Sequence, residues 1–205
     1  MRCTNCKTKF IPKYFNQKFC LETDECIKAF STFAKAAQSK KNAKESRDKT
    51  KAMKEGLLTI THYKTILQTP INHIIRLIDE GVPCIATGAI IGKRNAGHYI
   101  SRGSNDTIRF HLDNIFIQSE HSNSFKGGDT IRFQDGLKQM YGIGYFEYVE
   151  TLRTIKPIKL SISQIKEKNI IAKNIVKELK AANMIYDAER RMELRNYYNN
   201  ELGIY

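Results

Sequence analysis

The chain has 205 residues, of which 41% are hydrophobic and 27% are charged, and this suits one or two small folded units. Such a length excludes a long multidomain enzyme. Apolar runs stay well short of the roughly 18 residues that a membrane helix requires, and the N-terminus lacks the apolar stretch of a signal peptide. We therefore expect a soluble, cytoplasmic protein with no membrane partner.

The charge is strongly positive and unevenly distributed. Lys and Arg number 34 against 21 Asp and Glu, a net charge of +13. Residues 1–54 hold 14 basic and 5 acidic groups, residues 55–155 hold ten of each, and residues 156–205 hold ten and six. Clustered cations release counterions from a nucleic-acid backbone, so this distribution favours a nucleic acid as a partner. An ordinary basic surface is the alternative interpretation.

Four of the five cysteines lie within the first 26 residues, as Cys3-x2-Cys6 and Cys20-x5-Cys26. In a reducing compartment such paired cysteines are typical of a tetrahedral zinc site. The sequence therefore predicts a structural Zn²⁺ held by four thiolates, in a module over residues 1–32. The gap in the second pair is wider than usual, so a disulfide or an unligated pair stays open.

Residues 33–56 are rich in Ala, Lys, Ser and Asn and lack an apolar stripe, which predicts a solvated basic helix or linker. One interpretation is an arm that grips phosphates and becomes ordered on binding DNA, and the other is a plain spacer. The residues expected to contact the nucleic acid are Lys40, Lys41, Lys44 and Arg47.

The next segment combines a helix with a short β unit. Apolar residues recur at helical spacing from Leu57 to Glu80, and Pro70 predicts either two helices or one kinked helix. Residues 98–101 and 107–118 have the composition of strands, and residues 119–127 suit a short helix or turn. This order predicts a ββα unit within a core over residues 57–155.

Three polar residues of this unit have the order of parts seen in HNH-type nucleases: His98, Asn114 and Asn123. The imidazole would deprotonate a water that attacks a phosphodiester, Mg²⁺ or Mn²⁺ would neutralise the leaving oxygen, and the two amides would fix the loop and the ring. By itself the spacing is a weak pattern that many chains match by chance.

Residues 156–205 are expected to form a C-terminal helical segment. Ser161 and Gln164 suit a capping box at the start of a long helix. An apolar stripe follows it. This helix either folds back on the core or pairs with a second copy in a homodimer.

Several motifs together resemble the phage NinG/Rap recombination proteins over residues 1 to about 155. These are the N-terminal cysteine pattern, Pro83-Cys-Ile, Ala96-Gly-His-Tyr99, Ile108-Arg-Phe110, Asn114-Ile115, Gln118, Asn123, Gly128, Leu137, Tyr141-Gly142 and Phe146. The resemblance implies a structure-specific, HNH-like DNA endonuclease of a phage, acting on branched DNA inside a bacterial host. By similarity His98 matches the general base, Asn114 the asparagine of the strand and Asn123 that of the helix.

The sequence departs from this family at the metal ligands. The family usually holds a second zinc with two Cys-x-x-Cys pairs, where this chain has Cys84 with Thr87 and Ser119 with Ser122. Hydroxyls are poor zinc ligands, so we expect one zinc rather than two. The acidic position before the histidine is Asn95, a weaker ligand for Mg²⁺ than a carboxylate.

Other side chains near the motif are candidates for replacing the lost ligands. Asp113, Glu120 and His121 flank the two asparagines and are possible ligands of a catalytic metal, although neighbouring residues point in different directions. Arg102 is a candidate clamp for phosphate oxygens, with a solvated arginine as the alternative.

The sequence as a whole predicts an α+β fold with a zinc module, a basic arm, an HNH-like core and a helical tail. The predicted function is metal-dependent hydrolysis of branched or single-strand-containing DNA during phage recombination. The alternatives are a DNA-binding recombination accessory that has lost catalysis and a structural or host-interaction protein of the phage with the same fold.

Overall fold

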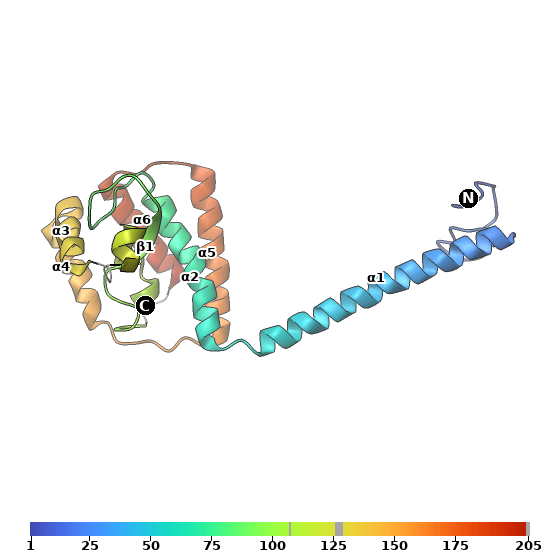
Figure 1. The fold of residues 1–205 in the computed structure, drawn as a ribbon, viewed down its shortest axis with the longest axis horizontal. Coiled ribbons are helices and arrows are strands. Elements are labelled where there is room, and N and C mark those ends of the chain that lie inside the picture. Colours follow the sequence, from blue (N-terminus) through green and yellow to red (C-terminus); the bar gives the residue numbers. More distant parts are fainter. Residues whose placement is uncertain (107, 126–128, 204–205) are drawn as a thin grey trace. The chain divides into compact units, whose positions relative to one another are not determined.

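The computed structural model describes residues 1–106, 108–125 and 129–203, and it divides into two compact units (Figure 1). The first unit is Met1–Leu58 and the second is Thr59–Tyr205. Each unit is described by itself. In the described part of the chain, we find no helix that combines the length and the apolar character needed to cross a membrane.

The first unit is a short N-terminal loop followed by one long helix, α1, Asp24–Gly56. The hydroxyl of Thr23 accepts a hydrogen bond from the backbone N–H of Cys26 at 3.3 Å, which caps the first turn. Asp24 and Glu25 add negative charge where the helix dipole is positive. The helix therefore begins inside the range 1–32 that was predicted for the zinc module.

The part of α1 that follows the cysteines is exposed to solvent. All of residues 33–54 are exposed, and Cys26 is the buried residue of the helix. Alanine and unbranched polar residues are good helix formers, and 33 residues at 1.5 Å each make a helix about 50 Å long. Such a helix is held by its propensity and its length rather than by packing.

The second unit is built on two neighbouring helices, α2, Ile60–Ile78, and α5, Ile162–Ala182 (Figure 1). The apolar stripe of α2 is buried, and the helix continues through Pro70 without a break. Ser161 and Gln164 form the predicted capping box, and α5 folds back on α2 as one of the two predicted alternatives. The buried residues of α5 are Ile165, Ala172, Ile175 and Leu179.

An antiparallel hairpin pairs β1, Arg94–His98, with β2, Ile115–Ser119, so that His98 faces Ile115 and Arg94 faces Ser119. The predicted strand bounds, 98–101 and 107–118, were therefore wrong. The apolar residues that suggested strands there are Tyr99, Ile100, Ile108 and Phe110, which are buried in the core without joining the ladder.

The segments around the hairpin are short helical turns and helices. Two 3₁₀ turns precede β2: η1, Ile108–Phe110, and η2, Leu112–Asn114. One π-helical turn, η3, His121–Phe125, follows β2 within the predicted helix or turn at 119–127, the last two residues of which lie outside the described ones. The remaining elements are α3, Thr130–Tyr141, α4, Ile143–Thr151, η4, Leu152–Thr154, and α6, Ala188–Leu202.

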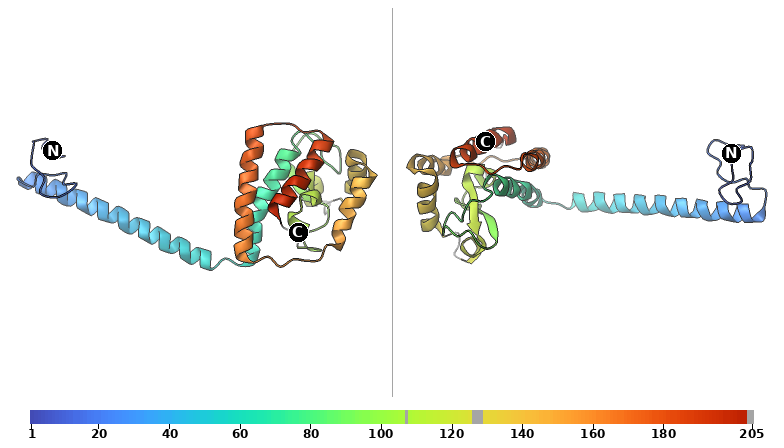
Figure 2. Two further views of the ribbon diagram at one scale, coloured as in Figure 1. Left: turned by 180° about the vertical axis from the view of Figure 1, so that it is seen from behind. Right: turned by 90° about the horizontal axis from the view of Figure 1, so that it is seen from above.

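The hairpin lies between α2 on one side and the α3–α4 pair on the other (Figure 2). Phe116 of β2 packs edge-to-face on Phe133 and Tyr141 of α3, at centroid distances of 5.9 and 5.5 Å. Tyr99 and Ile100 join the same core. The fold is thus mixed and mostly helical around a small sheet, which agrees with the predicted α+β class.

Candidate functional site

The four N-terminal cysteines meet in one cluster, with their sulfur atoms all within 4.8 Å of one another. The sulfurs of Cys3 and Cys26 lie 3.8 Å apart, and those of Cys6 and Cys20 lie 3.7 Å apart. A regular ZnS₄ tetrahedron with bonds of about 2.3 Å has edges of about 3.8 Å. A disulfide needs about 2.05 Å, so the cluster has the spacing of a metal site rather than of a bonded pair.

Local backbone geometry positions these sulfurs. Cys26 lies in the first turn of α1, and the backbone N–H of Cys20 donates to the sulfur of Cys3 at 3.4 Å. The side-chain amide of Asn5 donates to the sulfur of Cys26 at 3.5 Å. Such N–H donors are typical of thiolate ligands, because they stabilise negative charge on sulfur.

The pKa values of the cluster indicate competition for negative charge. Burial raises the pKa of Cys3, but hydrogen bonds, first of all from the backbone of Cys20, outweigh it and lower the pKa to about 6. A backbone hydrogen bond at Glu22 lowers the pKa of Cys20, whereas burial and the neighbouring sulfurs raise it to about 12. All four groups can therefore be thiolates together only around a cation, and the donor set fits Zn²⁺.

A second candidate site is a polar pocket of about 320 Å³ beside His98. His98 ends β1, and the pocket also takes side chains from α2, from the loop after β1 and from η3. The lining residues are Asn72, Arg76, Asn95, Ala96, His98, Ser101, Arg102 and Asn123. Its charged groups among the described residues are two arginines, so the pocket is suited to an anion.

The ring of His98 is fixed by one hydrogen bond. Its Nε2 lies 2.9 Å from the backbone oxygen of Arg109. A carbonyl oxygen only accepts, so the neutral ring carries its proton on Nε2 and keeps the lone pair on Nδ1. Burial lowers the pKa of His98 to about 4; the bond to Arg109 opposes this, and the charges of Arg102 and Arg109 add to it. At neutral pH the ring is therefore an unprotonated base.

The guanidinium of Arg109 is itself held by two side chains. It donates to Gln68 of α2 at 3.3 Å and to Asp106 at 3.2 Å, and Asp106 pairs with Lys64 of α2. Because the backbone carbonyl of Arg109 accepts the hydrogen bond from His98, this chain of contacts ties the imidazole to α2.

The two predicted asparagines have different positions. Asn114 is fully buried, and its side-chain oxygen accepts from the N–H of Ile100 at 2.7 Å. Its amide donates to the carbonyls of Ile100 and Ile108, at 3.0 and 3.1 Å. It thus fixes both ends of the loop that joins His98 to Arg109. Asn123 lines the pocket together with His98.

Gly97 is a residue of this site that the sequence did not single out for a role. A Cβ there would lie 2.3 Å from the side-chain oxygen of Gln118 and 3.2 Å from that of Asn123. The two side chains thus lie close to the backbone next to His98, and any larger residue at position 97 would displace Gln118. The signal was present in the Ala96-Gly-His-Tyr99 motif, where the small residue precedes the histidine.

The three possible metal ligands flanking the asparagines do not line the pocket. Asp113 is buried in a separate network, where it accepts from Asn199 at 2.8 Å and from the hydroxyl of Tyr145. Glu120 pairs with Lys93 at 2.6 Å, and His121 is exposed. Among the residues that the structure describes, the cysteine cluster is the group of three or more Cys, His, Asp or Glu arranged to hold a metal.

A family model described as Bacteriophage Lambda NinG protein matches residues 1–182. The chain belongs to the NinG family. Protein ninG of Salmonella phage P22 is 29% identical over 164 residues, which span 73% of this chain and 80% of that protein. Protein ninG of Escherichia phage lambda is 28% identical over 185 residues, or 80% of this chain and 90% of that protein. No solved structure matches the chain.

The positions at which the resemblance to NinG proteins implies a second zinc do meet in space. The backbone N–H of Ser119 donates to the sulfur of Cys84 at 3.1 Å, and that of Ser122 donates to the hydroxyl of Ser119 at 3.3 Å. Thr87 hydrogen bonds the Cys84 sulfur as well. The hydroxyl oxygen of Ser122 is buried and has no hydrogen-bond partner in the described structure. We name these four residues the hydroxyl corner.

In this NinG-family chain the last helix locks the hairpin that carries His98. Arg195 of α6 is fully buried, pairs with Asp79 at 2.7 Å and donates to the backbone oxygen of Ile115 at 2.8 Å and to that of Leu112. Asn199 accepts from the backbone N–H of Leu112 at 2.9 Å. The sequence offered no signal for these partners, because they lie far from the hairpin along the chain.

The basic residues predicted to contact DNA have two locations. Lys40, Lys41, Lys44 and Arg47 all lie on α1 and are exposed. Arg102 is exposed at the pocket beside His98, where Arg76 of α2 accompanies it. Arg76 was missed, since nothing in an amphipathic helix distinguishes an arginine that borders a site from a solvated one.

Proposed function

We propose that this chain hydrolyses phosphodiester bonds in branched or single-strand-containing DNA, with His98 as the general base. The observation that carries the proposal is the hydrogen bond from Nε2 of His98 to the backbone oxygen of Arg109. It leaves Nδ1 as the basic atom of a ring that borders a polar pocket. A base with this orientation can take the proton of a water molecule as the water attacks phosphorus.

The charges of the pocket support a phosphate as its ligand. Arg76 and Arg102 both border the space beside His98. Arginine binds phosphate oxygens through paired N–H groups, and it stabilises the charge that develops as the phosphorus centre becomes five-coordinate. In this mechanism His98 moves the proton, the two arginines hold the phosphate, and Asn114 keeps the loop behind the imidazole in place.

The family resemblance implies a catalytic Mg²⁺ or Mn²⁺, but the side chains that line this pocket are not a suitable ligand set for such an ion. The described lining residues offer amide oxygens from Asn72, Asn95 and Asn123 and no carboxylate. Hard divalent cations prefer carboxylate oxygens, and a neutral amide binds them less well. The proposed hydrolysis therefore relies on His98 and the two arginines rather than on a metal ion held by the pocket.

Binding of the DNA itself is proposed to involve α1. Lys40, Lys44 and Arg47 are spaced by four and three residues, so they lie on one face of that exposed helix. Each contact with a phosphate releases counterions, so binding should weaken steeply as salt is added.

The missing carboxylate favours a second candidate function, a DNA-binding recombination accessory that has lost catalysis. It keeps the same basic surfaces and the same fold. The nuclease cleaves branched DNA and needs His98 to do so. The accessory protein binds the DNA without cleaving it.

The test is cleavage of labelled four-way junction, forked and linear duplex DNA by the zinc-loaded chain, with Mg²⁺, with Mn²⁺ and without either. We expect cleavage of the branched DNA that falls about 10²- to 10⁴-fold in His98→Ala, the usual contribution of a general base. His121→Ala is the matched control, since that imidazole is exposed and does not line the pocket, and it should retain activity.

The outcomes separate the candidates. Binding of branched DNA without cleavage under every condition supports the accessory function and contradicts the nuclease. Cleavage that survives His98→Ala contradicts the role of the imidazole. Loss of cleavage in His98→Ala counts only if that variant keeps its zinc content and its helical circular dichroism.

A further inference from the structure

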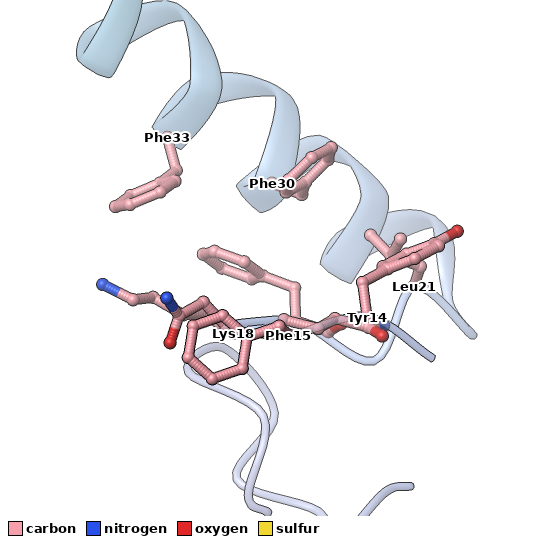
Figure 3. Close-up of a pocket in the computed structure, with 9 residues that line it drawn as sticks. Tyr14, Phe15, Lys18, Leu21, Phe30 and Phe33 are labelled. Carbon is pink, nitrogen blue, oxygen red and sulfur yellow. The ribbon is translucent and has the colours of Figure 1, made fainter. Parts of the chain in front are cut away.

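The N-terminal unit carries an aromatic groove that the zinc cluster and the nuclease proposal both leave unused. The groove has a volume of about 490 Å³ and lies between α1 and the loop before Cys20 (Figure 3). We name it the aromatic groove; its lining residues are Tyr14, Phe15, Asn16, Gln17, Lys18, Phe19, Leu21, Phe30 and Phe33.

Large aromatic side chains of this groove are unusually exposed to water. Phe15 is 96% exposed, and Tyr14 is 65% exposed. Phe30 and Phe33 project from α1 toward the loop that carries Phe15 and Lys18 (Figure 3). Exposed apolar surface of this kind marks an interaction site, because burial of aromatic rings is strongly favourable.

The groove has a firm floor. Phe19 is 5% exposed and packs against Phe30 and Phe33 at centroid distances of 5.9 and 5.6 Å. Phe19 also belongs to the buried cluster of Cys3, Cys20 and Cys26. The metal site therefore holds the rings in place, so that a flat ligand meets a preformed aromatic surface.

The charges around the groove favour an anionic ligand. Of the described lining residues, Lys18 is the charged one, and its ammonium lies 5.4 Å from the centre of the Phe33 ring. Residues 1–54 together carry 14 basic and 5 acidic groups. The groove combines aromatic rings with a lysine in a basic region. A flat ring attached to a negative backbone matches both features better than an acidic or an apolar protein segment does.

We propose that the aromatic groove binds unpaired bases of single-stranded DNA, stacked on Phe15, Phe30 and Phe33, with Lys18 on the adjacent phosphate. Aromatic rings beside a basic surface are the usual means of binding single strands without base-pair readout. The inference deepens the proposed function and rests on it in taking DNA as the ligand. It names single-stranded regions of a branched molecule as what the N-terminal unit binds.

The test measures fluorescence anisotropy of labelled oligothymidylate of about 15 nucleotides, near the longest site sizes of single-strand binding folds. Two comparison ligands are an abasic strand of equal length and charge, and a duplex. The full zinc-loaded chain carrying His98→Ala is used, so that cleavage cannot interfere. We expect oligothymidylate to bind more tightly than the abasic strand.

The decisive variants are Phe15→Ala and Phe33→Ala. Each should weaken binding of oligothymidylate by about 5- to 150-fold, the usual effect of removing one stacking ring, and leave binding of the abasic strand unchanged. Ile11→Ala is the matched control, because Ile11 is 90% exposed in the same loop and does not line the groove. It should bind like the unmodified chain.

Three results would overturn the inference. Equal binding of the oligothymidylate and abasic strands would show that bases are not recognised. If Phe15→Ala lost the same affinity for the duplex as for the single strand, the ring would contribute to DNA binding in general and not to binding of unpaired bases. Unchanged DNA binding together with a shift from dimer to monomer in sedimentation of Phe15→Ala would identify a second copy of the chain as the occupant.

These results are independent of the nuclease test. Binding of bases by the groove with no cleavage of any DNA would leave this inference standing and remove the proposed catalysis. Cleavage that depends on His98 with no loss in Phe15→Ala would do the reverse.

Discussion

Two parts of the molecule bring four side chains together in the same way and hold them by different means. The N-terminal cysteine cluster presents four thiols at the spacing of a zinc tetrahedron. The hydroxyl corner gathers the thiol of Cys84 and the hydroxyls of Thr87, Ser119 and Ser122. Backbone N–H groups donate to the Cys84 sulfur and the Ser119 hydroxyl, and the Ser122 hydroxyl has no partner in the described structure.

The difference follows from the size of the core next to each group. The loop of the first unit buries little besides its cysteines, Phe10 and Phe19. The hydroxyl corner adjoins a much larger core, which includes Phe116, Phe133 and Leu137. A small module needs a metal in place of buried apolar surface, whereas a larger unit can fold on its apolar core without one.

Removal of the N-terminal metal ligands should have the largest effect. Cys3→Ser should reduce the zinc content from one ion per chain to none and unfold the loop before α1, since structural zinc contributes about 10–16 kcal/mol in small modules. Elemental analysis and amide hydrogen exchange measure this. Cys84→Ser is the control and should leave the zinc content unchanged; zinc lost from both variants would show that the corner binds metal too.

Introducing thiols into the hydroxyl corner should create a second metal site. The triple variant Thr87→Cys, Ser119→Cys, Ser122→Cys should bind two zinc ions per chain and raise the unfolding temperature of the second unit, because the four positions already meet. A triple alanine variant should bind one. If the cysteine variant also binds one, the corner lacks the geometry of the first cluster.

The second unit should depend on its buried ion pair rather than on metal. Asp79→Ala leaves Arg195 buried and uncompensated, which we expect to cost about 3–5 kcal/mol of unfolding free energy. Urea unfolding of that unit measures the loss. Asp187→Ala is a control at an exposed carboxylate and should cost about 1 kcal/mol, the value of a helix cap. A matching loss of zinc would show that the N-terminal cluster depends on the second unit.

Acid should weaken the second unit through its buried histidines. Burial lowers the pKa of His98 and of His111 to about 4, against 6.5 for a free imidazole. The unfolded chain therefore binds protons first as the pH falls, so stability is full above pH 6.5 and declines down to pH 4. We expect a loss of about 2 kcal/mol per histidine by pH 5.

The measurement is urea unfolding of the second unit at pH 7 and pH 5. His98→Gln should show about half of the acid-induced loss, since one of the two histidines no longer titrates. An equal stability at both pH values would mean that these imidazoles take up protons in the folded chain.

The parts of the molecule that the sequence predicted well are those set by local spacing. The four cysteines lie within 26 residues, and their paired spacing was enough to place them in one cluster. The apolar stripe of α2 and the capping box of α5 are likewise periodic or adjacent signals. Such segments are predictable because residues close together in the sequence determine their structure.

The prediction failed where a buried loop has the same apolar and aromatic composition as a strand. Tyr99 and Ile100 have strand-like composition because they are buried, yet the side chain of Asn114 rather than a neighbouring strand bonds the backbone of Ile100. The contribution of Arg76 to the pocket and the pairing of Asp79 with Arg195 depend on contacts between distant segments. A single sequence carries no pattern for such contacts.

The anchoring of the hairpin by α6 has a consequence for the order of events during translation. Arg195 follows Ile115 by 80 residues, so the hairpin beside His98 acquires this partner long after it has left the ribosome. The cysteine loop is made first and holds all four of its ligands from the start. A nascent chain can therefore load zinc while its histidine pocket is still unfinished, and any chemistry of that pocket begins only once synthesis has reached the last helix.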